Sequence, residues 1–426
     1  MDILEQFRMH RHIICIDLKS FFASVECADN GWDPFKKLMV VADASRGEGS
    51  IILAVSPALK EHGVPGRLRI FELPRHLKKD IDIVKPNMRK YVDASNKILN
   101  MYLRYFDVND ILVYSIDEVF IDITSYTKLY KKTPYQITAM LLSNLRKEFK
   151  LYAAAGIGPN MLMAKFALDI EAKHNSDFIA TWNYEDIPNK LWPITKLTDV
   201  WGIGGGLSKR LDLLGIKSMG ELANYDVKKL IKHFGIMGEE MYLHANGIDI
   251  SRIQDQGKLS KRKGYSIGST LMQDTPKDIT RIKLLDLVSE IITRLRVDKK
   301  TTNLIHVHVR YAFKESQPSF SMQRKLSNHT LDYNTIKQAV LAIYDTNVLD
   351  INIRKIGISV SNIADFTGVQ LDLFAQGKDA LNADLDFAYD EINSKFGKNT
   401  IVKASHLQKD SSFLDRAKLI GGHNAE

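Results

Sequence analysis

The stretch "ILVYSIDEVFIDI", Ile111 to Ile123, decides the fold. Most of it is typical of an apolar β-strand, yet Asp117 and Glu118 stand side by side in its middle. Neighbouring residues of a plain strand point to opposite faces of a sheet, so these carboxylates act together only where the chain turns. The stretch therefore predicts a hairpin corner between "ILVYSI" and "VFIDI".

Crowded carboxylates in an apolar setting repel each other and lose hydration unless a cation compensates. Oxygen ligands favour hard ions such as Mg²⁺. Asp17 ends another apolar run, "HIICID", and is a candidate third ligand. An arbitrary Asp-Glu pair is more often a surface turn with salt bridges, so local spacing alone leaves that alternative open.

The composition limits the class of protein. A chain of 426 residues is too long for one ordinary core, so several domains are expected. Lys and Arg number 59 against 51 Asp and Glu, a net charge of +8 that suits a polyanionic partner without requiring one. The two cysteines, Cys15 and Cys27, give no disulfide framework, which fits a reducing cytoplasm. No run of about 18 apolar residues appears, so a membrane span is not expected.

The first half of the chain alternates strand and helix patterns. Ser20 is predicted to cap a helix that begins at Phe21, directly after the strand that carries Asp17. "LMVVAD" and "SIILAVS" predict a hairpin, and residues 77–105 are mostly helical in pattern. In "AGIGPNMLMAKFALDIEAK" a small-residue strand stops at Gly158, and Pro159 is predicted as the first residue of a helix that carries Lys165.

The second half predicts a helical unit and then an α+β unit. Residues 197–216 predict two helices joined by a glycine hairpin, "HFGIMGEEMYLHANGID" a weaker second copy, and the basic stretch near residue 258 a linker. Helices are expected at 279–298 and 332–346. In "NLIHVHVRYAF" apolar and polar residues alternate, which predicts a strand with two different faces. The apolar face consists of Ile305, Val307, Val309, Tyr311 and Phe313. The polar face consists of His306, His308 and Arg310.

Three motifs in order, "IDLKSFFASVE", "SIDEVFID" and "AGIGPNMLMAKFALDIEAK", closely resemble those of the Y-family translesion DNA polymerases, and within them the UmuC-like branch. The resemblance runs from about Arg11 to Phe374. It implies DNA-directed DNA synthesis in damage tolerance and the SOS response, with two Mg²⁺ ions as cofactors. Asp17, Asp117 and Glu118 match the catalytic and metal-binding acids, and the backbone of Leu18 joins the ligands.

The resemblance also implies the fold class, an α+β multidomain right-hand polymerase. It has a ferredoxin-like palm, small fingers, a helical helix-hairpin-helix thumb and an α+β little-finger domain. The expected boundaries are 1–17 and 80–170 for the palm, 18–79 for the fingers, 171–252 for the thumb, 258–364 for the little finger and 365–426 for the tail.

The remaining site residues follow from the same motifs. Phe22 aligns with the steric gate, whose ring excludes a ribose 2′-hydroxyl. Lys60 and Lys165 match positions that contact the triphosphate, while Pro57 replaces a tyrosine common in the family. The backbone N–H groups of residues 18–22 are expected to meet phosphate oxygens. The predicted DNA contacts are Gly202, Gly204, His306, His308 and Arg310.

The implied partners are primer-template DNA, a dNTP and the replicative sliding clamp, and the branch admits a UmuD-like accessory subunit. "QLDLF" resembles a clamp-binding peptide, with Gln370, Leu371, Leu373 and Phe374 as the contacts. A catalytically idle DNA-binding scaffold would lack an acid or the phosphate lysine. A palm-type nucleotide cyclase would lack the hairpin thumb, the little finger and the clamp-like peptide.

Overall fold

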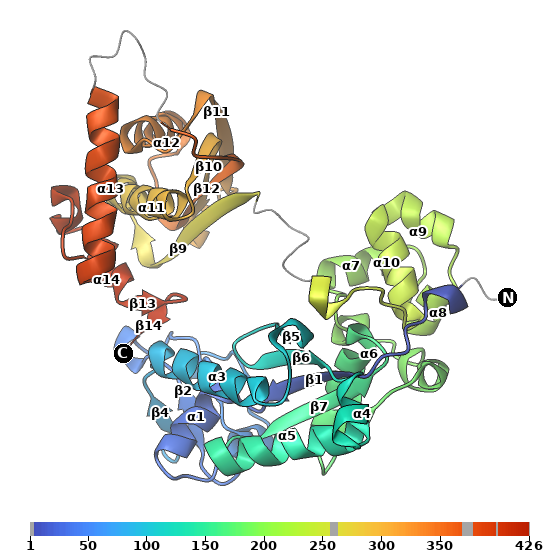
Figure 1. Cartoon of the computed structure of the whole chain (residues 1–426). Coiled ribbons are helices and arrows are strands. Elements are labelled where there is room, and N and C mark those ends of the chain that lie inside the picture. Colours follow the sequence, from blue (N-terminus) through green and yellow to red (C-terminus); the bar gives the residue numbers. More distant parts are fainter. Residues whose placement is uncertain (1–3, 256–262, 369–377, 398, 426) are drawn as a thin grey trace. The chain divides into compact units, whose positions relative to one another are not determined.

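The computed structural model describes residues 4–255, 263–368, 378–397 and 399–425 (Figure 1). The chain forms two compact units. The first contains residues 1–257 and the last four residues, and the second contains residues 258–422. The boundary falls within the predicted linker. The four-domain division inside these units stays a prediction.

The first unit is built on a five-stranded sheet in the order β5-β6-β1-β7-β8. Its strands are β1 (Ile13–Leu18), β5 (Ile111–Val113), β6 (Glu118–Asp122), β7 (Ala153–Gly158) and β8 (Ile179–Thr181). The central strand, β1, is antiparallel to both β6 and β7, and β8 is parallel to β7. Every residue of β1 except Asp17 is buried, as expected for a strand covered on both faces.

Alternation along β1 gives the sheet two different faces. Ile14, Ile16 and Leu18 belong to a core shared with helices α1 (Phe21–Asp29), α3 (Met88–Leu103) and α5 (Pro134–Phe149). Cys15 belongs to a second core that includes α6 (Met161–Phe166). Asp17, two residues after Cys15, therefore lies on the α6 side of the sheet.

A small three-stranded sheet joins β2 (Met39–Val41), β3 (Ala54–Val55) and β4 (Asp82–Val84). β2 is antiparallel to β3, which confirms the predicted pairing, and parallel to β4. The short helices α2 (Pro57–Glu61) and α4 (Tyr126–Tyr130) lie elsewhere in this unit. The prediction that residues 77–105 are mostly helical was wrong at its start, because Pro86 disfavours helix before it and Asn87 caps α3.

The helical part of the first unit contains α7 (Gly205–Asp212), α8 (Met219–Ala223), α9 (Val227–Phe234) and α10 (Ile236–Ala245). Before the first glycine hairpin the chain makes one 3₁₀ turn, Leu197–Asp199, where a full helix was predicted. The predicted second copy is two α-helices joined at Gly235, whose φ is +63°.

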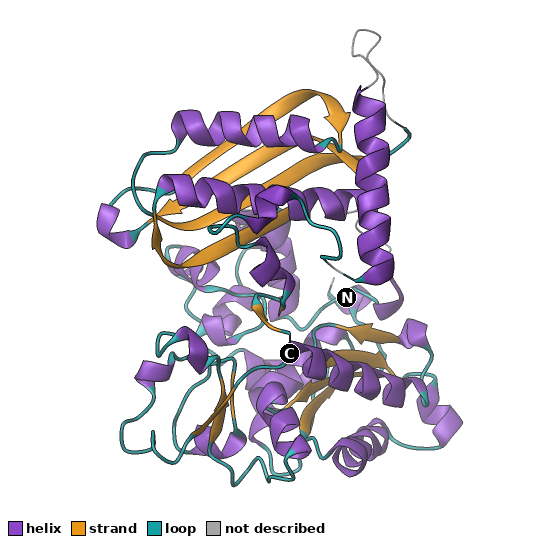
Figure 2. Cartoon of the chain, turned by 90° about the vertical axis from the view of Figure 1, so that its left-hand side faces the viewer, coloured by secondary structure: helices purple, strands orange, loops and turns teal. Residues whose placement is uncertain are grey.

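The second unit is an antiparallel four-stranded sheet in the order β11-β10-β12-β9. The strands are β9 (Gly264–Thr275), β10 (Lys300–Tyr311), β11 (Phe320–Thr330) and β12 (Ile353–Asp365). Helices α11 (Lys277–Val297) and α12 (Tyr333–Asn347) cover one face (Figure 2), which confirms both predicted helices. The predicted alternation of β10 holds through Tyr311, but Phe313 is 94% exposed because it follows the end of the strand.

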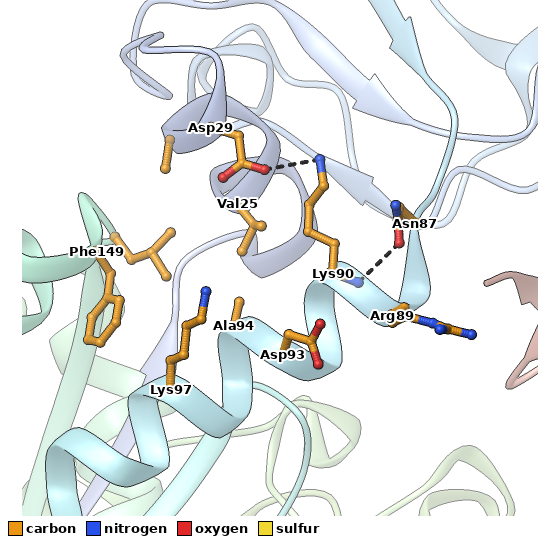
Figure 3. Close-up of a pocket in the computed structure, with 11 residues that line it drawn as sticks. Val25, Asp29, Asn87, Arg89, Lys90, Asp93, Ala94, Lys97 and Phe149 are labelled. Carbon is orange, nitrogen blue, oxygen red and sulfur yellow. Dashed lines mark hydrogen bonds and ion pairs between the residues drawn. The ribbon is translucent and has the colours of Figure 1, made fainter. Parts of the chain in front are cut away.

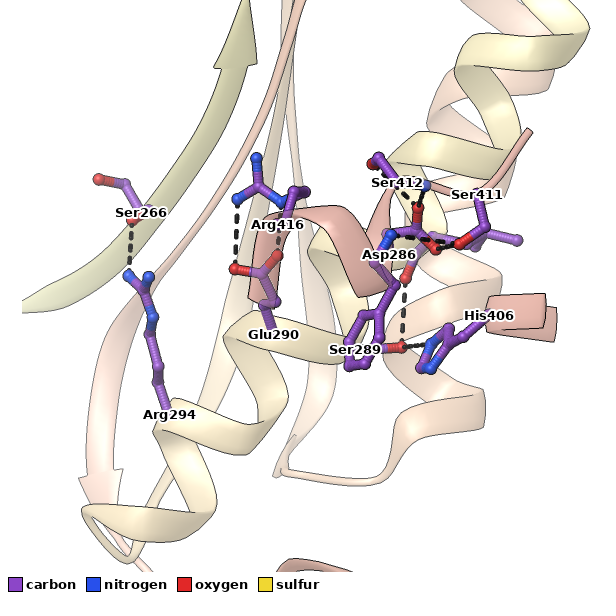
Figure 4. A network of polar contacts seen from close by, with 11 residues as sticks. Ser266, Asp286, Ser289, Glu290, Arg294, His406, Ser411, Ser412 and Arg416 are labelled. Carbon is purple, nitrogen blue, oxygen red and sulfur yellow. Dashed lines mark hydrogen bonds and ion pairs between the residues drawn. The ribbon is translucent and has the colours of Figure 1, made fainter. Parts of the chain in front are cut away.

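The chain after β12 contains α13 (Lys378–Phe396), α14 (Phe413–Ala417), β13 (Leu419–Ile420) and β14 (His423–Asn424). A polar network holds residues 406–416 against α11 (Figure 4). In it Asp286 accepts hydrogen bonds from Ser411 and Ser412, and Arg416 pairs with Glu290. Across the described residues we find no helix with the length and apolar character that a membrane span requires.

Candidate active site

Asp117 and Glu118 lie at the corner of a β-hairpin, as the sequence predicted. β5 and β6 pair antiparallel with Ile111 opposite Ile121, and Glu118 is the first residue of β6. The backbone N–H groups of Tyr114 and Ser115 both donate to the Glu118 carbonyl, which closes the turn. The Ser115 hydroxyl donates to Asp117 Oδ1 at 2.7 Å, so a turn residue orients the first carboxylate.

The hairpin brings these acids to the end of β1. Asp17 is directly opposite Glu118 in the antiparallel register, so both side chains leave the same face of the sheet. The Leu18 N–H donates to the Asp117 carbonyl at 3.0 Å, which ties the third acid to the same strand end. The fold therefore brings Asp17 to two acids that lie about 100 residues later in the sequence.

Each carboxylate has a partner of its own in this conformation. Lys173 Nζ lies 2.5 Å from Asp17 Oδ2, and Lys165 Nζ lies 2.7 Å from Glu118 Oε1. Within the part of the chain that the structure describes, no three His, Cys, Asp or Glu side chains converge as a ready metal site. The donor set, carboxylate oxygens beside backbone carbonyls, nevertheless fits a hard divalent cation.

Glu118 and Lys165 form a buried pair. Their side chains are 11% and 7% exposed, and Lys165 also lies 3.3 Å from Asp169. The Cys15 thiol donates to Glu118 Oε1 at 3.2 Å, and burial, followed by the charge of Glu118, raises the pKa of this thiol well above its usual value. The predicted contact of Lys165 with a triphosphate stays a prediction; in this structure its buried ammonium is held by two carboxylates.

Two glycines of β7 allow α6 to carry Lys165 so close to the sheet. A Cβ added at Gly156 would lie 2.0 Å from the Ala164 carbonyl oxygen, and one at Gly158 would lie 2.6 Å from the Ala164 nitrogen. Any larger residue would push the helix away. The helix begins at Met161 rather than at the predicted Pro159, because Asn160 accepts a hydrogen bond from the Met163 N–H as its N-cap.

Lys173 is the residue beside the acids that the sequence reasoning did not single out. It lies in a 3₁₀ turn, Ala172–His174, and pairs with both Asp17 and Asp169. Burial opposes its charge, but the two carboxylates outweigh burial and raise its pKa. The available signal was a second lysine at the end of the third motif, two helical turns after Lys165, where the helical pattern stops.

Two more lysines stand near Asp17. Burial lowers the pKa of Lys19, and the positive charges of Lys173 and Lys60 lower it further. Burial also lowers the pKa of Lys60, with Asp17 acting against the shift. The charge of Lys173 thus acts on both Lys19 and Lys60, as expected for cations that are grouped near Asp17. Pro57 is buried and is the first residue of α2, the helix that carries Lys60. Its role is therefore to start this helix.

Phe22 and Phe21 differ in burial, and the role of Phe22 as a steric gate stays a prediction. Phe21 is 3% exposed in the core, whereas Phe22 is half-buried and stacks on Tyr91 at 4.4 Å between ring centres. The prediction that Ser20 caps this helix was wrong, since Ser20 adopts φ 49° and its side chain makes no capping hydrogen bond. The Leu18 and Lys19 N–H groups also bond to the Asp117 and Tyr152 carbonyls, so two of the five predicted phosphate donors are already occupied.

The glycine hairpin of the helical part is open to solvent. Gly202 has φ +91°, and no atom lies within 4 Å of a Cβ built at Gly202, Gly204 or Gly205. Gly204 precedes α7 without a side-chain cap, so the first N–H groups of the helix have no intrahelical partner. This geometry suits approach of a phosphate.

In the second unit, His306, His308 and Arg310 lie on the sheet face that the helices leave uncovered. His306 contacts the Ser321 hydroxyl at 2.7 Å and the Ser359 hydroxyl at 3.2 Å. Lys355 is directly opposite Arg310 and adds a cation that the sequence reasoning did not single out. Burial, together with Lys355 and its basic neighbours, lowers the pKa of His308.

A pocket of about 380 Å³ lies between α1 and α3, on the helix-covered side of the large sheet (Figure 3). In this pocket Lys90 forms an ion pair with Asp29. Asp93 and Lys97 also line the pocket. It contains none of the predicted site residues. The clamp-peptide residues Gln370, Leu371, Leu373 and Phe374 lie outside the described residues.

Three family models match the chain. They are the impB/mucB/samB family at residues 16–169, its helix-hairpin-helix motif at 184–216 and its C-terminal domain at 262–373. The UvrX protein of Bacillus subtilis is 34% identical across 97% of this chain and 98% of its own length. DNA polymerase IV 2 of the same organism is 31% identical across 96% of this chain and 98% of its own length.

The solved structures include a Y-family DNA polymerase chimera, Dbh-Dpo4(243-245)-Dbh, with a TM-score of 0.63 and 20% identity. The match covers 83% of this chain and 99% of the chain of the chimera. At this identity the likeness concerns the fold, and it confirms the predicted α+β right-hand architecture. The family models and the full-length relatives together establish the class: the chain belongs to the impB/mucB/samB family of Y-family translesion DNA polymerases.

Proposed function

We propose that this protein is a DNA-directed DNA polymerase that extends a primer-template with dNTPs across damaged template positions. The observation that carries the proposal is the register of Asp17 opposite Glu118, with Asp117 at the adjoining hairpin corner. Three carboxylates at one strand end suit the binding of divalent cations. The relatives named DNA polymerase IV support the same reaction.

Asp17, Asp117 and Glu118, with the backbone of Leu18, are the proposed ligands of two Mg²⁺ ions. Bound metal would stabilise the charge that develops as the primer 3′-hydroxyl attacks the α-phosphate and pyrophosphate leaves. The chain's own part is to hold the carboxylates in place. Ser115 orients Asp117, while Lys165 and Cys15 hold Glu118 on the face of the sheet that α6 covers.

Lys173 and Lys60 are the proposed ligands of the nucleotide triphosphate. Lys173 is the better placed, because its ammonium already lies on Asp17 and keeps Asp169 as a second partner. A phosphate group arriving beside Asp17 would take the same ammonium as a charge-assisted hydrogen-bond donor. Phe22 is proposed as the residue that excludes the 2′-hydroxyl of a ribonucleotide.

The DNA backbone is proposed to lie against Gly202 and Gly204 and, in the second unit, against the face formed by His306, His308 and Arg310. These contacts read phosphates and no sequence. Gln370, Leu371, Leu373 and Phe374 are proposed to dock on the sliding clamp, and a UmuD-like subunit is a further proposed partner. Leu373→Ala with Phe374→Ala should abolish clamp stimulation and leave clamp-independent synthesis near normal. A fall in both activities would contradict docking.

Primer extension on one template, with and without a single abasic site, tests the proposed reaction. Asp17→Asn, Asp117→Asn and Glu118→Gln should each reduce nucleotide addition by at least about 10³-fold while primer-template binding persists. Asp93→Asn, an exposed acid on the opposite side of the sheet, is the matched control and should leave extension unchanged. Near-normal extension by Asp117→Asn would disprove the metal assignment.

A further inference from the structure

Lys19 contacts the segment that carries Lys173. Its Nζ donates to the Lys173 carbonyl at 3.3 Å and lies 3.9 Å from the centre of the Phe178 ring. One side chain therefore touches both ends of the connection from Lys173 to Phe178. Its own backbone is fixed, because the Lys19 N–H donates to the Tyr152 carbonyl at 2.8 Å.

The connection that Lys19 touches is irregular. It begins in the 3₁₀ turn Ala172–His174 and ends at Phe178, a non-glycine residue with φ +59°. Asn175 braces it by donating to the Ile179 carbonyl. A carbonyl outside a regular helix needs a partner of its own, and a bulky residue at positive φ is strained unless its surroundings hold it. Lys19 contributes to both requirements, as a donor to the carbonyl and as a cation on the ring.

Lys19 is also placed to link this connection to the metal-binding acids. It follows Asp17 by two residues, and Asp17 is the carboxylate that Lys173 contacts. The distance between the Asp17 carboxylate and the Lys173 ammonium thus depends on two attachments of the same segment. One is the ion pair itself, and the other is the Lys19 side chain behind it. When a nucleotide displaces the ion pair, the Lys19 contacts remain, together with the hydrogen bond from the Ala155 N–H to the Phe178 carbonyl.

We propose that Lys19 is a positioning residue for the incoming nucleotide: it holds the segment from Lys173 to Phe178 so that the Lys173 ammonium stays at the triphosphate position. The proposal rests on the polymerase function proposed above. Lys19 acts through Lys173 and does not itself touch the substrate. Loss of Lys19 should therefore weaken dNTP binding and leave the chemical step nearly intact.

Three variants separate this role from a direct charge effect. Lys19→Met keeps most of the apolar stem but loses the donor and the cation, whereas Lys19→Arg keeps both. Single-nucleotide insertion should show a KM for dNTP about tenfold higher in Lys19→Met, with kcat changed less than about threefold. Lys19→Arg should restore KM. Lys97→Met, an exposed lysine of α3 in the pocket of Figure 3, is the matched control and should behave as the wild type.

A double-mutant cycle with Lys173→Met gives the decisive comparison. If Lys19 acts through Lys173, the double variant is no worse than Lys173→Met alone, because the positioned group is already absent. Additive losses in KM would overturn the proposal and assign Lys19 its own contact with the substrate. A fall in kcat at unchanged KM, or no effect of Lys19→Met, would also overturn it.

Amide hydrogen exchange supplies a readout that needs no catalysis. In the full chain without nucleotide, residues 173–178 should exchange faster in Lys19→Met than in the wild type, and at the wild-type rate in Lys19→Arg and Lys97→Met. Unchanged exchange in Lys19→Met would overturn the positioning role. A wild-type protein that fails to insert nucleotides, while the exchange pattern follows expectation, would disprove the polymerase proposal and leave the structural role of Lys19 intact.

Discussion

Asp17 of β1 and Glu118 of β6 stand directly opposite each other in the antiparallel register, yet each is held by a different lysine. Lys173, which holds Asp17, has a side chain that is 35% exposed, whereas Lys165, which holds Glu118, has one that is 7% exposed. A half-buried ammonium can leave its carboxylate at a lower cost than a fully buried one. The two lysines of the third motif therefore differ in burial, and we expect removal of Lys165 to cost more stability than removal of Lys173.

Lys165→Met should destabilise the first unit, because it leaves Glu118 and Asp169 without their buried cation. Breaking a buried ion pair by removing one partner costs about 3 to 5 kcal/mol. Chemical denaturation followed by tryptophan fluorescence measures this directly, since all four tryptophans, at positions 32, 182, 192 and 201, lie in the first unit. Lys173→Met is the matched comparison and should change stability by less than about 1 kcal/mol. Equal losses in the two variants would contradict this expectation.

Phe22→Ala should admit ribonucleotides, because the ring that stacks on Tyr91 no longer fills the space for a 2′-hydroxyl. Excluding a group by steric overlap costs about 1 to 3 kcal/mol, which corresponds to roughly tenfold to hundredfold discrimination. The measurement is the ratio of kcat/KM for dNTP and rNTP on one primer-template. Tyr91→Phe keeps the stack and loses only the hydroxyl contact with Glu26, so it should retain the sugar selectivity of the wild type. Unchanged selectivity in Phe22→Ala, with normal dNTP use, would remove Phe22 as the gate.

Arg310→Ala with Lys355→Ala should weaken primer-template binding equally on unrelated sequences. The two cations lie opposite each other on the uncovered face of the second sheet, and phosphate contacts carry no sequence information. Each lost phosphate contact should reduce the slope of log affinity against log salt by about 1. Titration at several salt concentrations tests this. Lys337→Ala on α12, the helix that packs on the other side of the sheet, should leave both affinity and slope unchanged.

The sequence was sufficient for the parts of the site that follow from local pattern. Asp117 and Glu118 predicted a turn, because a strand cannot place neighbouring side chains on one face. The structure has the predicted hairpin between β5 and β6. The alternation of β10 likewise predicted which side chains would be buried. These inferences succeeded because the periodicity of a strand depends on the strand alone.

The lysine assignment depended on distances that periodicity does not contain. Lys165 and Lys173 both follow the glycine strand, and only the close approach of α6 over Gly156 and Gly158 decides which of them is buried on Glu118. The prediction that Ser20 caps α1 failed for a related reason. Ser20 is a residue type that favours the N-cap, but it follows two residues whose N–H groups bond to distant segments, and it adopts a left-handed conformation without a capping bond.

The contact between the chain's C-terminal part and α11 should loosen in acid, and His406 is the reason. Its ring is 4% exposed, stacks on Phe413 at 3.7 Å and contacts the Ser289 hydroxyl at 3.0 Å (Figure 4). Burial, and then the charge of Lys403, lowers its pKa to about 4, with Glu290 acting in the opposite direction. The docked segment thus holds a neutral imidazole that becomes protonated near its ordinary pKa once it is released.

The sign of the effect follows from proton binding. Between about pH 6.5 and about pH 4 the released segment binds a proton at His406 and the docked one does not, so docking weakens as the pH falls. A shift of this size corresponds to at most about 3 kcal/mol, fully lost below the lower pKa. Burial raises the pKa of Asp286, which acts in the opposite direction and strengthens docking in acid. A comparison between the wild type and a His406 variant that retains Asp286 therefore isolates the contribution of His406 to the pH dependence of docking.

His406→Gln is that variant, because it keeps a polar group near Ser289 and cannot be protonated. Hydrogen exchange of residues 404–417, corrected for the intrinsic rate at each pH, measures the free energy of local opening. In the wild type this free energy should fall between pH 7 and pH 4, and in His406→Gln it should stay nearly flat, even if the lost stacking on Phe413 lowers it at every pH. Ser289→Ala removes the hydroxyl contact, keeps the titrating ring and should therefore retain the pH dependence. Parallel curves for the wild type and His406→Gln would show that another group controls the release.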